Sequence, residues 1–242
     1  MVNLKGKVAI VTGADAGIGY ETALLFAECG ADIVITDVNE SGMTELQKQA
    51  EKLGVKCEKY ICDISDEVAV HNTVADVLDK FGKIDILVNN AGIYKTGNGP
   101  FVDSDRAEWK KKIDINILGT LYFTQEVLEN MIKNNSGRII NIGSVAGVYG
   151  LHEWSIYSMT KGAIISFTTA LAKEMGKYNI TVNTVSPGNI HPPHTDNYPD
   201  MSYLGRSGTT RECANVIGFL ASDEASYVSG QNYLVDGARK KI

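Results

Sequence analysis

Short apolar runs alternate with amphipathic stretches along the whole chain. Val8–Val11 is a continuous apolar run, which is typical of a strand buried on both faces. The stretches between such runs have helical spacing, and several of them stop at a glycine, as at Gly30, Gly54 and Gly82. This alternation predicts repeated βαβ units around a parallel sheet.

The apolar runs predict strands at Val8–Val11, Ile33–Thr36, Lys56–Cys62, Ile84–Val88, Arg138–Ile142, Thr181–Val185 and Asn232–Val235. The amphipathic stretches predict helices from the first glycine-rich turn to Gly30, at Glu40–Leu53, from a Ser65 cap to Phe81, at about Asp105–Lys133, at Ser155–Tyr178 and at Arg211–Ala221. Glycine and proline are dispersed, without a linker, repeat or low-complexity tract. We therefore predict a single α/β domain, residues 1–242, with a doubly wound parallel sheet.

Composition and charge argue against several classes of protein. The chain has 242 residues, of which 44% are apolar and 21% charged, as is ordinary for a globular domain. A net charge of −6 gives no reason to expect nucleic acid or an anionic membrane as partner. We find no signal-peptide pattern and no apolar run of membrane-spanning length. The four scattered cysteines favour reduced thiols, so we expect a cytoplasmic protein.

A glycine-rich loop, Thr12–Gly19, follows the first predicted strand and opens the first helix. Glycine lets the backbone turn tightly and approach a pyrophosphate closely, while free N–H groups at the helix N-terminus face the anion. A glycine-rich turn alone is a weak signal, but its place in a βαβ unit favours a Rossmann-type dinucleotide site. The loop residues predicted to contact the dinucleotide are Gly13, Asp15, Gly17, Ile18 and Gly19.

Asp37 closes the second predicted strand, about 20 residues beyond the loop. A carboxylate there accepts hydrogen bonds from the adenosine ribose hydroxyls and repels a 2′-phosphate. No Lys or Arg lies nearby in the sequence, and Asp15 and Ala16 add no cation to the loop. The sequence therefore favours NAD over NADP as the cofactor.

Two later strand ends supply further candidate contacts with the same cofactor. The carboxyl ends of parallel strands meet at one edge of the sheet, where ligands of open α/β folds bind. The candidates at the ends of the third and fourth strands are Asp63, Ile64, Asn90, Ala91 and Gly92.

With these residues the chain resembles the short-chain dehydrogenase/reductase family, in its single-domain branch. The resemblance runs from Lys7 to Gly237. It rests on motifs in compatible order, namely Thr12–Gly19, Asp63, Asn89–Gly92, Asn116, Ser144, Tyr157-x-x-x-Lys161 and Pro187-Gly188. It implies a catalytic set of Asn116, Ser144, Tyr157 and Lys161, in which Tyr157 and Lys161 also contact the cofactor.

The chemistry of this set can be checked against the residues. Tyr157 and Lys161 are four residues apart on one predicted helix, so they face the same way. A free phenol has a pKa near ~10, and we expect the ammonium and the charge of the oxidised nicotinamide to lower it. Tyr157 would then donate or accept the proton that accompanies hydride transfer. Ser144 would orient the substrate oxygen. The resemblance implies that Asn116 helps to hold a water linking Lys161 to solvent, while a helix-packing role for Asn116 stays open.

The resemblance weakens after Pro187-Gly188, in a proline-rich segment at about 189–208 that we interpret as a substrate lid. The family implies nicotinamide contacts from Pro187, Gly188 and Ile190, followed by a threonine. Here Pro192 has no N–H to donate, and Thr195 is a candidate for a displaced equivalent. His191 and His194 lack further ligands in their pattern, so we expect no metal.

The family position of the substrate pocket implies a lining of Ser144, Tyr94, Val145, Tyr149, His152 and Trp154. Such a lining suits a secondary alcohol or ketone, such as a hydroxysteroid, a sugar alcohol or a small diol.

We therefore expect an NAD(H)-dependent alcohol dehydrogenase or ketone reductase. One alternative is a 3-oxoacyl-thioester reductase of fatty-acid synthesis, a role that usually uses NADPH, so Asp37 counts against it. Another is a non-catalytic NAD(H)-binding sensor or scaffold, against which the intact Ser144, Tyr157 and Lys161 argue.

The two long predicted helices, Asp105–Lys133 and Ser155–Tyr178, carry more apolar residues than one sheet face would cover. Together with the family resemblance, this favours a symmetric homo-oligomer, and we expect a homotetramer. The other expected partner is a small-molecule substrate.

Overall fold

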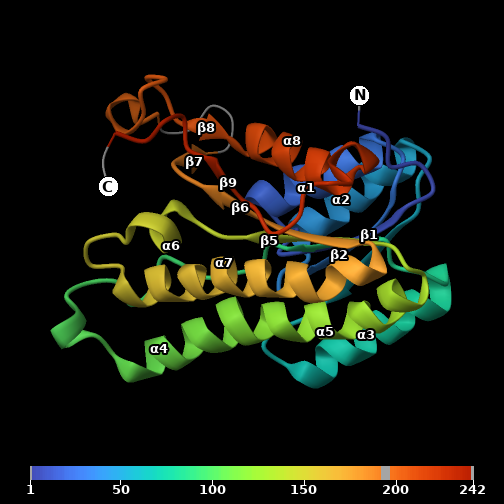
Figure 1. Ribbon diagram of the computed structural model, residues 1–242, viewed down its shortest axis with the longest axis horizontal. Coiled ribbons are helices and arrows are strands. Elements are labelled where there is room, and N and C mark those ends of the chain that lie inside the picture. Colours follow the sequence, from blue (N-terminus) through green and yellow to red (C-terminus); the bar gives the residue numbers. More distant parts are fainter. Residues whose placement is uncertain (1, 192–196, 241–242) are drawn as a thin grey trace.

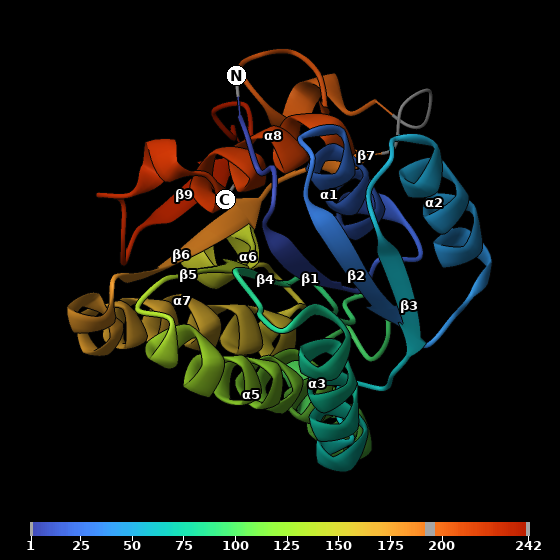
Figure 2. The ribbon, with the colours of Figure 1, turned by 90° about the vertical axis from the view of Figure 1, so that its right-hand side faces the viewer.

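The chain folds around one parallel sheet in the computed structural model, which describes residues 2–191 and 197–240. The sheet has seven strands in the order β3-β2-β1-β4-β5-β6-β9, and every neighbouring pair is parallel (Figure 2). The strands of this sheet are β1 Val8–Thr12, β2 Asp32–Asp37, β3 Cys57–Ile61, β4 Ile86–Asn89, β5 Gly137–Ile142, β6 Ile180–Pro187 and β9 Asn232–Val235. The predicted single-domain, doubly wound Rossmann-type fold is confirmed.

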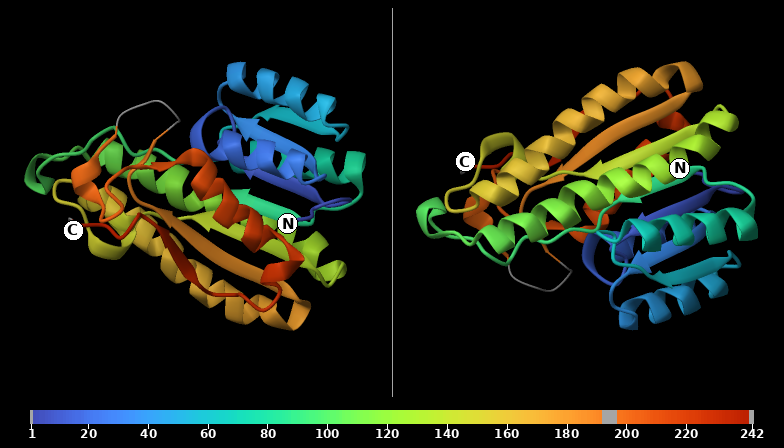
Figure 3. Two further views of the ribbon diagram at one scale, coloured as in Figure 1. Left: turned by 90° about the horizontal axis from the view of Figure 1, so that it is seen from above. Right: turned by 90° about the horizontal axis from the view of Figure 1, so that it is seen from below.

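Helices cover both faces of the sheet. In Figures 1 and 3, α1, α2 and α8 lie on one face, and α3, α5 and α7 lie on the other. The α-helices are α1 Gly17–Glu28, α2 Ser41–Lys52, α3 Glu67–Phe81, α4 Arg106–Ile113, α5 Gly119–Lys133, α6 Val145–Tyr149, α7 Ser155–Met175 and α8 Thr210–Ala221. A second, two-stranded sheet pairs β7 Ile190–His191 with β8 Gly208–Thr209.

Each face of the large sheet has its own hydrophobic core. Ala9 and Val11 of β1 pack with α1, α2 and α8, whereas Val8 and Ile10 pack with α3, α5 and α7. All five residues of β1 are buried. A strand covered on both faces needs apolar residues at every position, which is why β1 is a continuous apolar run in the sequence.

The strand order reverses at β1, which has β2 on one side and β4 on the other. Ligands of open α/β sheets bind in the crevice at the carboxyl ends of the strands at such a switch point. The strand ends bring Thr12, Asp37, Asn89 and Ile142 to this edge. The fold therefore gathers the predicted cofactor and catalytic segments at one place.

Two local predictions about helices are wrong. The single helix expected at about Asp105–Lys133 is interrupted between α4 and α5 by a π-helical turn, η2 Asp114–Leu118. The predicted Ser65 cap of α3 is replaced by Asp66, whose carboxylate accepts from the N–H groups of Val68 and Ala69 at 3.0 and 3.1 Å. A one-residue shift of a cap or a turn barely changes the spacing of apolar residues, so the sequence pattern does not reveal either feature.

The four cysteines, Cys29, Cys57, Cys62 and Cys213, are free thiols as predicted. Burial raises the pKa of Cys57 and Cys213 to about 12, so neither thiol is a nucleophile near neutral pH. In the part of the chain that the structure describes, no helix is both long and apolar enough to cross a membrane.

Candidate active site

The glycine-rich loop leaves open space in front of the N-terminus of α1. Gly13 and Gly17 have φ angles of +66° and +64°, in the left-handed region that favours glycine. A Cβ on Gly19 would lie 2.1 Å from the Gly13 carbonyl oxygen, whereas a Cβ on Gly17 would meet nothing within 4 Å. Ala16, which precedes α1, gives the helix no side-chain cap. The uncapped N–H groups and the open space beside Gly17 fit a dinucleotide pyrophosphate.

Thr12 and Asn90 hold this loop against the end of β4. The Thr12 Oγ1 accepts from the backbone N–H groups of Asn90 and Ala91, both at 3.0 Å. The Asn90 Nδ2 donates to the carbonyl oxygens of Thr12 and Gly13, both at 2.9 Å. The loop after β1 and the end of β4 are thus hydrogen-bonded directly to each other. Asn90 was predicted to contact the cofactor, but its side-chain nitrogen is bonded to the glycine-rich loop. The sequence showed Thr12 only as the first residue of the loop, and its bracing role was missed.

Asp37, the predicted ribose ligand, lies at the carboxyl end of β2 beside the loop. Its Oδ2 accepts from the Asp15 backbone N–H and its Oδ1 from that of Asn39, each at 3.1 Å. Each carboxylate oxygen keeps a second lone pair for a ribose hydroxyl. Asp15, predicted to contact the cofactor, directs its own carboxylate to the Gly42 N–H in the first turn of α2, at 2.6 Å. Two carboxylates therefore adjoin the place where an adenosine ribose fits.

Cations are scarce around these carboxylates. The sequence has no Lys or Arg between Lys7 and Lys48. Lys59, on the adjacent strand β3, has its ammonium 2.8 Å from both the Glu40 carboxylate and the Thr44 hydroxyl. A 2′-phosphate on the ribose would thus meet negative charge without a free counter-charge from these residues.

Ser144, Tyr157 and Lys161 come together at the end of β5, as predicted. Ser144 precedes α6 and is mostly buried; its Oγ accepts from the Ala146 N–H at 3.1 Å, and its hydroxyl acts to lower the pKa of Tyr157. Lys161 lies one turn after Tyr157 on α7, with its Nζ 6.0 Å from the centre of the phenol ring. The same Nζ donates to the Ile142 carbonyl oxygen at 2.8 Å. The i and i+4 spacing therefore places both side chains on the same side of α7.

Asn116 lies in the π-helical turn and is almost fully buried. Its side-chain amide accepts from the Ile93 N–H at 2.8 Å and donates to the Ile93 carbonyl at 3.0 Å and to the Thr160 hydroxyl at 3.2 Å. A Cβ on Gly92 would lie 3.1 Å from its Oδ1 and 3.5 Å from the Lys161 Nζ. The predicted cofactor residue Gly92 therefore lies over Asn116 and Lys161. A π-helical turn is often found at functional sites.

The predicted pKa shift of Tyr157 has the opposite sign in the chain without its cofactor. Burial raises the pKa of the phenol, and the hydrogen bond with Ser144 lowers it only in part. The ammonium of Lys161 binds the Ile142 carbonyl, and burial lowers the pKa of Lys161 to about 8. In this geometry the Lys161 ammonium does not outweigh the effect of burial on the Tyr157 pKa.

The buried Lys161 makes the stability of the cofactor-free protein depend on pH. The folded pKa of about 8 is below the ordinary 10.5, so between these values the unfolded chain holds a proton that the folded chain has released, and stability rises with pH. We expect wild type to gain about 3 kcal/mol relative to Lys161→Met between pH 7 and 10.5, from 1.36 kcal/mol per pKa unit. Urea unfolding of both proteins across this range measures the gain. A difference between them that does not vary with pH would contradict the burial of a charged Lys161.

Three aromatic rings form one wall next to the catalytic hydroxyl. The Tyr94 ring lies 6.4 Å from that of Trp154 and 6.3 Å from that of Tyr157, and the Trp154 and Tyr157 rings are 5.7 Å apart, nearly edge-to-face. Tyr94 and Trp154 thus lie beside Tyr157, and their predicted contact with substrate stays a prediction. Tyr149 and His152 are exposed on the turn before Trp154, and their contact with substrate stays a prediction.

Asp63 and Ile64, which were also predicted to contact the cofactor, follow β3. The exposed Asp63 carboxylate accepts from the Ser65 backbone N–H at 2.9 Å and hydroxyl at 2.7 Å. Ile64 is buried against α5, where a Cβ on Gly119 would lie 2.5 Å from its Cγ1. Their contact with the cofactor stays a prediction.

The segment after β6 is only partly described. β6 ends at Pro187, and the Gly188 N–H donates to the Val235 carbonyl at 2.9 Å. Ile190, in β7, packs against the hydrophobic core, and the His191 ring lies 5.2 Å from that of Tyr198. Pro192, Pro193, His194 and Thr195 lie outside the described residues, so the displaced threonine stays a prediction.

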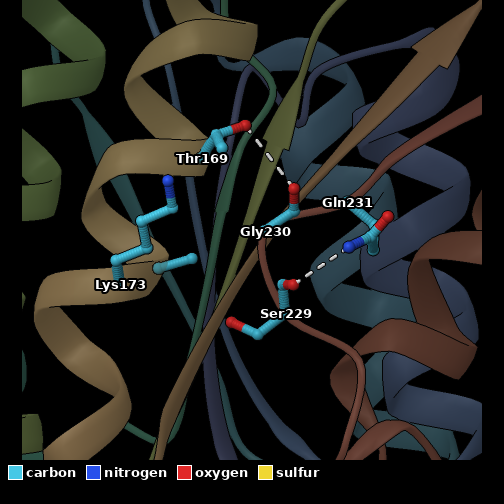
Figure 4. Close-up of a pocket in the computed structure, with 6 residues that line it drawn as sticks. Thr169, Lys173, Ser229, Gly230 and Gln231 are labelled. Carbon is cyan, nitrogen blue, oxygen red and sulfur yellow. Dashed lines mark hydrogen bonds between the residues drawn. The ribbon is translucent and has the colours of Figure 1, made fainter.

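A surface cavity of about 210 Å³ lies elsewhere, beside the far part of α7 and the loop before β9 (Figure 4). Its lining includes Thr169, Lys173 and Gln231. Lys173 is twelve residues beyond Lys161 on the same helix, which is about 18 Å along the axis. This cavity is therefore separate from the catalytic edge of the sheet.

Comparison with known proteins identifies the class to which this site belongs. A sequence model described as enoyl-(acyl carrier protein) reductase matches residues 13–238. A 3-oxoacyl-(acyl-carrier-protein) reductase of Thermotoga maritima is 40% identical over 98% of both chains. A (2S)-((R)-hydroxy(phenyl)methyl)succinyl-CoA dehydrogenase subunit of Thauera aromatica is 37% identical, again over 98% of both chains. The structure of an NAD⁺-bound xylitol dehydrogenase superposes with a TM-score of 0.92 at 33% identity, over 97% of this chain and 99% of the other.

These matches cover nearly the whole chain. The chain belongs to the short-chain dehydrogenase/reductase family, as the sequence motifs suggested. It is therefore an oxidoreductase that uses a nicotinamide dinucleotide.

Proposed function

We propose that this protein interconverts 3-oxoacyl and 3-hydroxyacyl thioesters, with NAD(H) as the hydride carrier. The arrangement of Ser144, Tyr157 and Lys161 beside an acidic ribose site is the observation on which the proposal depends. The thioester is favoured by the two relatives at 37% and 40% identity, whose names both specify acyl-thioester substrates. From the sequence we expected a hydroxysteroid, a sugar alcohol or a small diol first, and a 3-oxoacyl thioester was the alternative. We now propose that alternative.

The bound nicotinamide supplies or accepts the hydride, and the residues of the chain handle the oxygen and its proton. Ser144 and Tyr157 present two hydroxyl groups to the 3-oxo oxygen. Tyr157 donates its proton to that oxygen in reduction and takes it back in oxidation. Lys161 supports the phenolate that is left, and its depressed pKa of about 8 lets it exchange a proton near physiological pH.

The choice between NADH and NADPH depends on Asp37. Like-charge contact with a 2′-phosphate costs several kcal/mol, so we expect kcat/KM for NADH to exceed that for NADPH by about 100-fold. Asp37→Ala should reduce this ratio to less than about tenfold. Asp32→Ala, at the opposite end of the same strand, should leave it unchanged. A wild-type preference for NADPH would overturn the assignment of NAD.

The substrate class is tested by assaying one preparation with acetoacetyl-CoA, xylitol, acetoin and a 3-ketosteroid. We expect kcat/KM to be highest for acetoacetyl-CoA by at least a factor of ten. Higher activity with xylitol would support a polyol dehydrogenase instead, the second candidate, which the superposition with an NAD⁺-bound xylitol dehydrogenase favours. NADH binding without turnover of any compound would favour the non-catalytic alternative.

We also propose that the enzyme assembles as a homotetramer. An apolar groove of about 230 Å³ lies between the outer sides of α5 and α7 and includes Leu121, Leu128 and Phe167. Matching grooves on two copies would cover these side chains around a two-fold axis. Sedimentation velocity should give about four times the 26.2 kDa chain mass, and Leu128→Glu should yield smaller species. A stable monomer in the wild-type protein would refute the proposal.

A further inference from the structure

Lys112, on α4, is 1% exposed, although it follows two exposed lysines in the sequence. Its ammonium donates to the Thr96 carbonyl oxygen and to the Asn98 Oδ1, the latter at 3.1 Å. It forms no ion pair with the residues that the structure describes. Lysine is rarely buried unless it is paired, so a buried ammonium held only by neutral oxygens of one loop is unusual.

Both oxygens belong to the segment 94–99, which begins at Tyr94 of the aromatic wall. Within this segment the Asn98 Nδ2 donates to the Tyr94 carbonyl at 2.6 Å. Gly97 has a φ of +59°, and a Cβ on it would lie 2.7 Å from the Glu108 Cβ on α4. The segment therefore lies directly on α4, and Lys112 reaches it from beneath.

The same segment is attached to the second aromatic residue of the wall. The Gly99 N–H donates to the Glu153 carbonyl at 2.8 Å, immediately before Trp154. The Tyr94 ring in turn stacks on Trp154 with an interplanar angle of 24°. A displacement of segment 94–99 would therefore move Tyr94 and Trp154 together relative to Tyr157.

The burial of Lys112 does not stabilise the fold by itself. Desolvation lowers the pKa of Lys112, and the charge of the Glu108 carboxylate opposes this only in part. Replacement of a buried charged group by an apolar side chain of similar volume is often neutral or stabilising. A buried lysine whose ammonium holds a loop beside the active site has the character of a positioning residue.

We propose that Lys112 positions segment 94–99 and thereby sets the distance between the Tyr94–Trp154 wall and the Tyr157 hydroxyl. It selects among substrates through this wall without touching them. The proposal rests on the proposed role of Tyr157 as the acid/base, but not on the identity of the substrate.

Lys112→Met tests the proposal against Lys111→Met, the matching change at its exposed neighbour. We expect Lys112→Met to keep or raise the melting temperature, to raise KM for acetoacetyl-CoA about tenfold, and to leave kcat and the NADH dissociation constant within twofold. Trypsin should cut after Lys95, inside the released segment, at least ten times faster. Lys111→Met should match wild type in all five measurements.

A second variant approaches the same contact from the loop. Asn98→Ala should also raise KM, and the double variant Asn98→Ala/Lys112→Met should show less than the sum of the two single effects, because the Lys112–Asn98 bond is common to both. Lys112→Gln, which keeps a donor, should recover part of the KM. Additive effects, an unchanged KM and cleavage rate, or a fall in kcat and melting temperature together would overturn the proposal. If wild type fails to turn over acetoacetyl-CoA, the proposed substrate fails, while the cleavage rate at Lys95 still tests the role of Lys112.

Discussion

Tyr157→Phe is expected to lower kcat about 1,000-fold, within the 10²- to 10⁴-fold range of general acid–base catalysis. The substitution removes only the hydroxyl and leaves the ring that packs against Tyr94 and Trp154. The aromatic wall should therefore persist, so the KM for substrate and the NADH dissociation constant should change less than threefold. Steady-state kinetics and NADH fluorescence titration measure the two effects separately.

The control is Tyr178→Phe, which removes a phenol hydroxyl just beyond the other end of α7. Its kcat should equal that of wild type. Residual activity of Tyr157→Phe above one tenth of wild type would show that another group moves the proton. Equal loss in NADH affinity and in kcat would instead indicate that the hydroxyl serves cofactor binding.

The fold could be predicted because its strongest constraint is local and periodic. A strand such as β1, buried on both faces, requires a continuous apolar run, and α3 must stop where Gly82 takes a φ of +75°. Consecutive residues meet these requirements, so the sequence pattern reveals them. The topology then follows from the right-handed connection of parallel strands, which places the loop ends at one edge.

The contacts that complete the site could not be predicted in the same way. The bond from Asn90 to the glycine loop joins residues 77 positions apart, and the amide of an asparagine suits a loop brace as well as a cofactor contact. The π-helical turn at Asn116 spans only Asp114–Leu118 within a longer helical stretch, too short a segment for a sequence pattern to mark. Lys112 resembles its exposed neighbours in sequence, and only the tertiary contact with Asn98 distinguishes it.

The direction of the Tyr157 pKa shift could not be predicted from the sequence alone. The sequence places an ammonium four residues from the phenol, which argues for a lowered pKa. Burial of the phenol and the attachment of the Lys161 Nζ to Ile142 outweigh that argument. Charge near a group and burial of that group act in opposite directions, and their balance is set by geometry.

Gly19→Ala is expected to impair both stability and cofactor binding. The added Cβ would lie 2.1 Å from the Gly13 carbonyl oxygen and 2.5 Å from the Asn90 Nδ2, and both atoms belong to the brace that shapes the loop. Overpacking of this kind costs about 1–3 kcal/mol and occasionally more, so we expect a fall in melting temperature of about 5–10 °C. The displaced loop should also weaken NADH binding by at least 100-fold.

Gly17→Ala separates the two effects. Its Cβ would meet no atom of the chain within 4 Å but would enter the space in front of α1. Because it would crowd the bound pyrophosphate there, we expect NADH affinity to fall about 10- to 100-fold. Left-handed backbone at φ +64° adds about 1–2 kcal/mol of strain. Gly54→Ala carries the same kind of strain at φ +81° with equally open surroundings, just beyond the end of α2. Gly54→Ala should therefore match Gly17→Ala in melting temperature and match wild type in NADH affinity. Normal NADH affinity in Gly17→Ala would show that the pyrophosphate binds elsewhere.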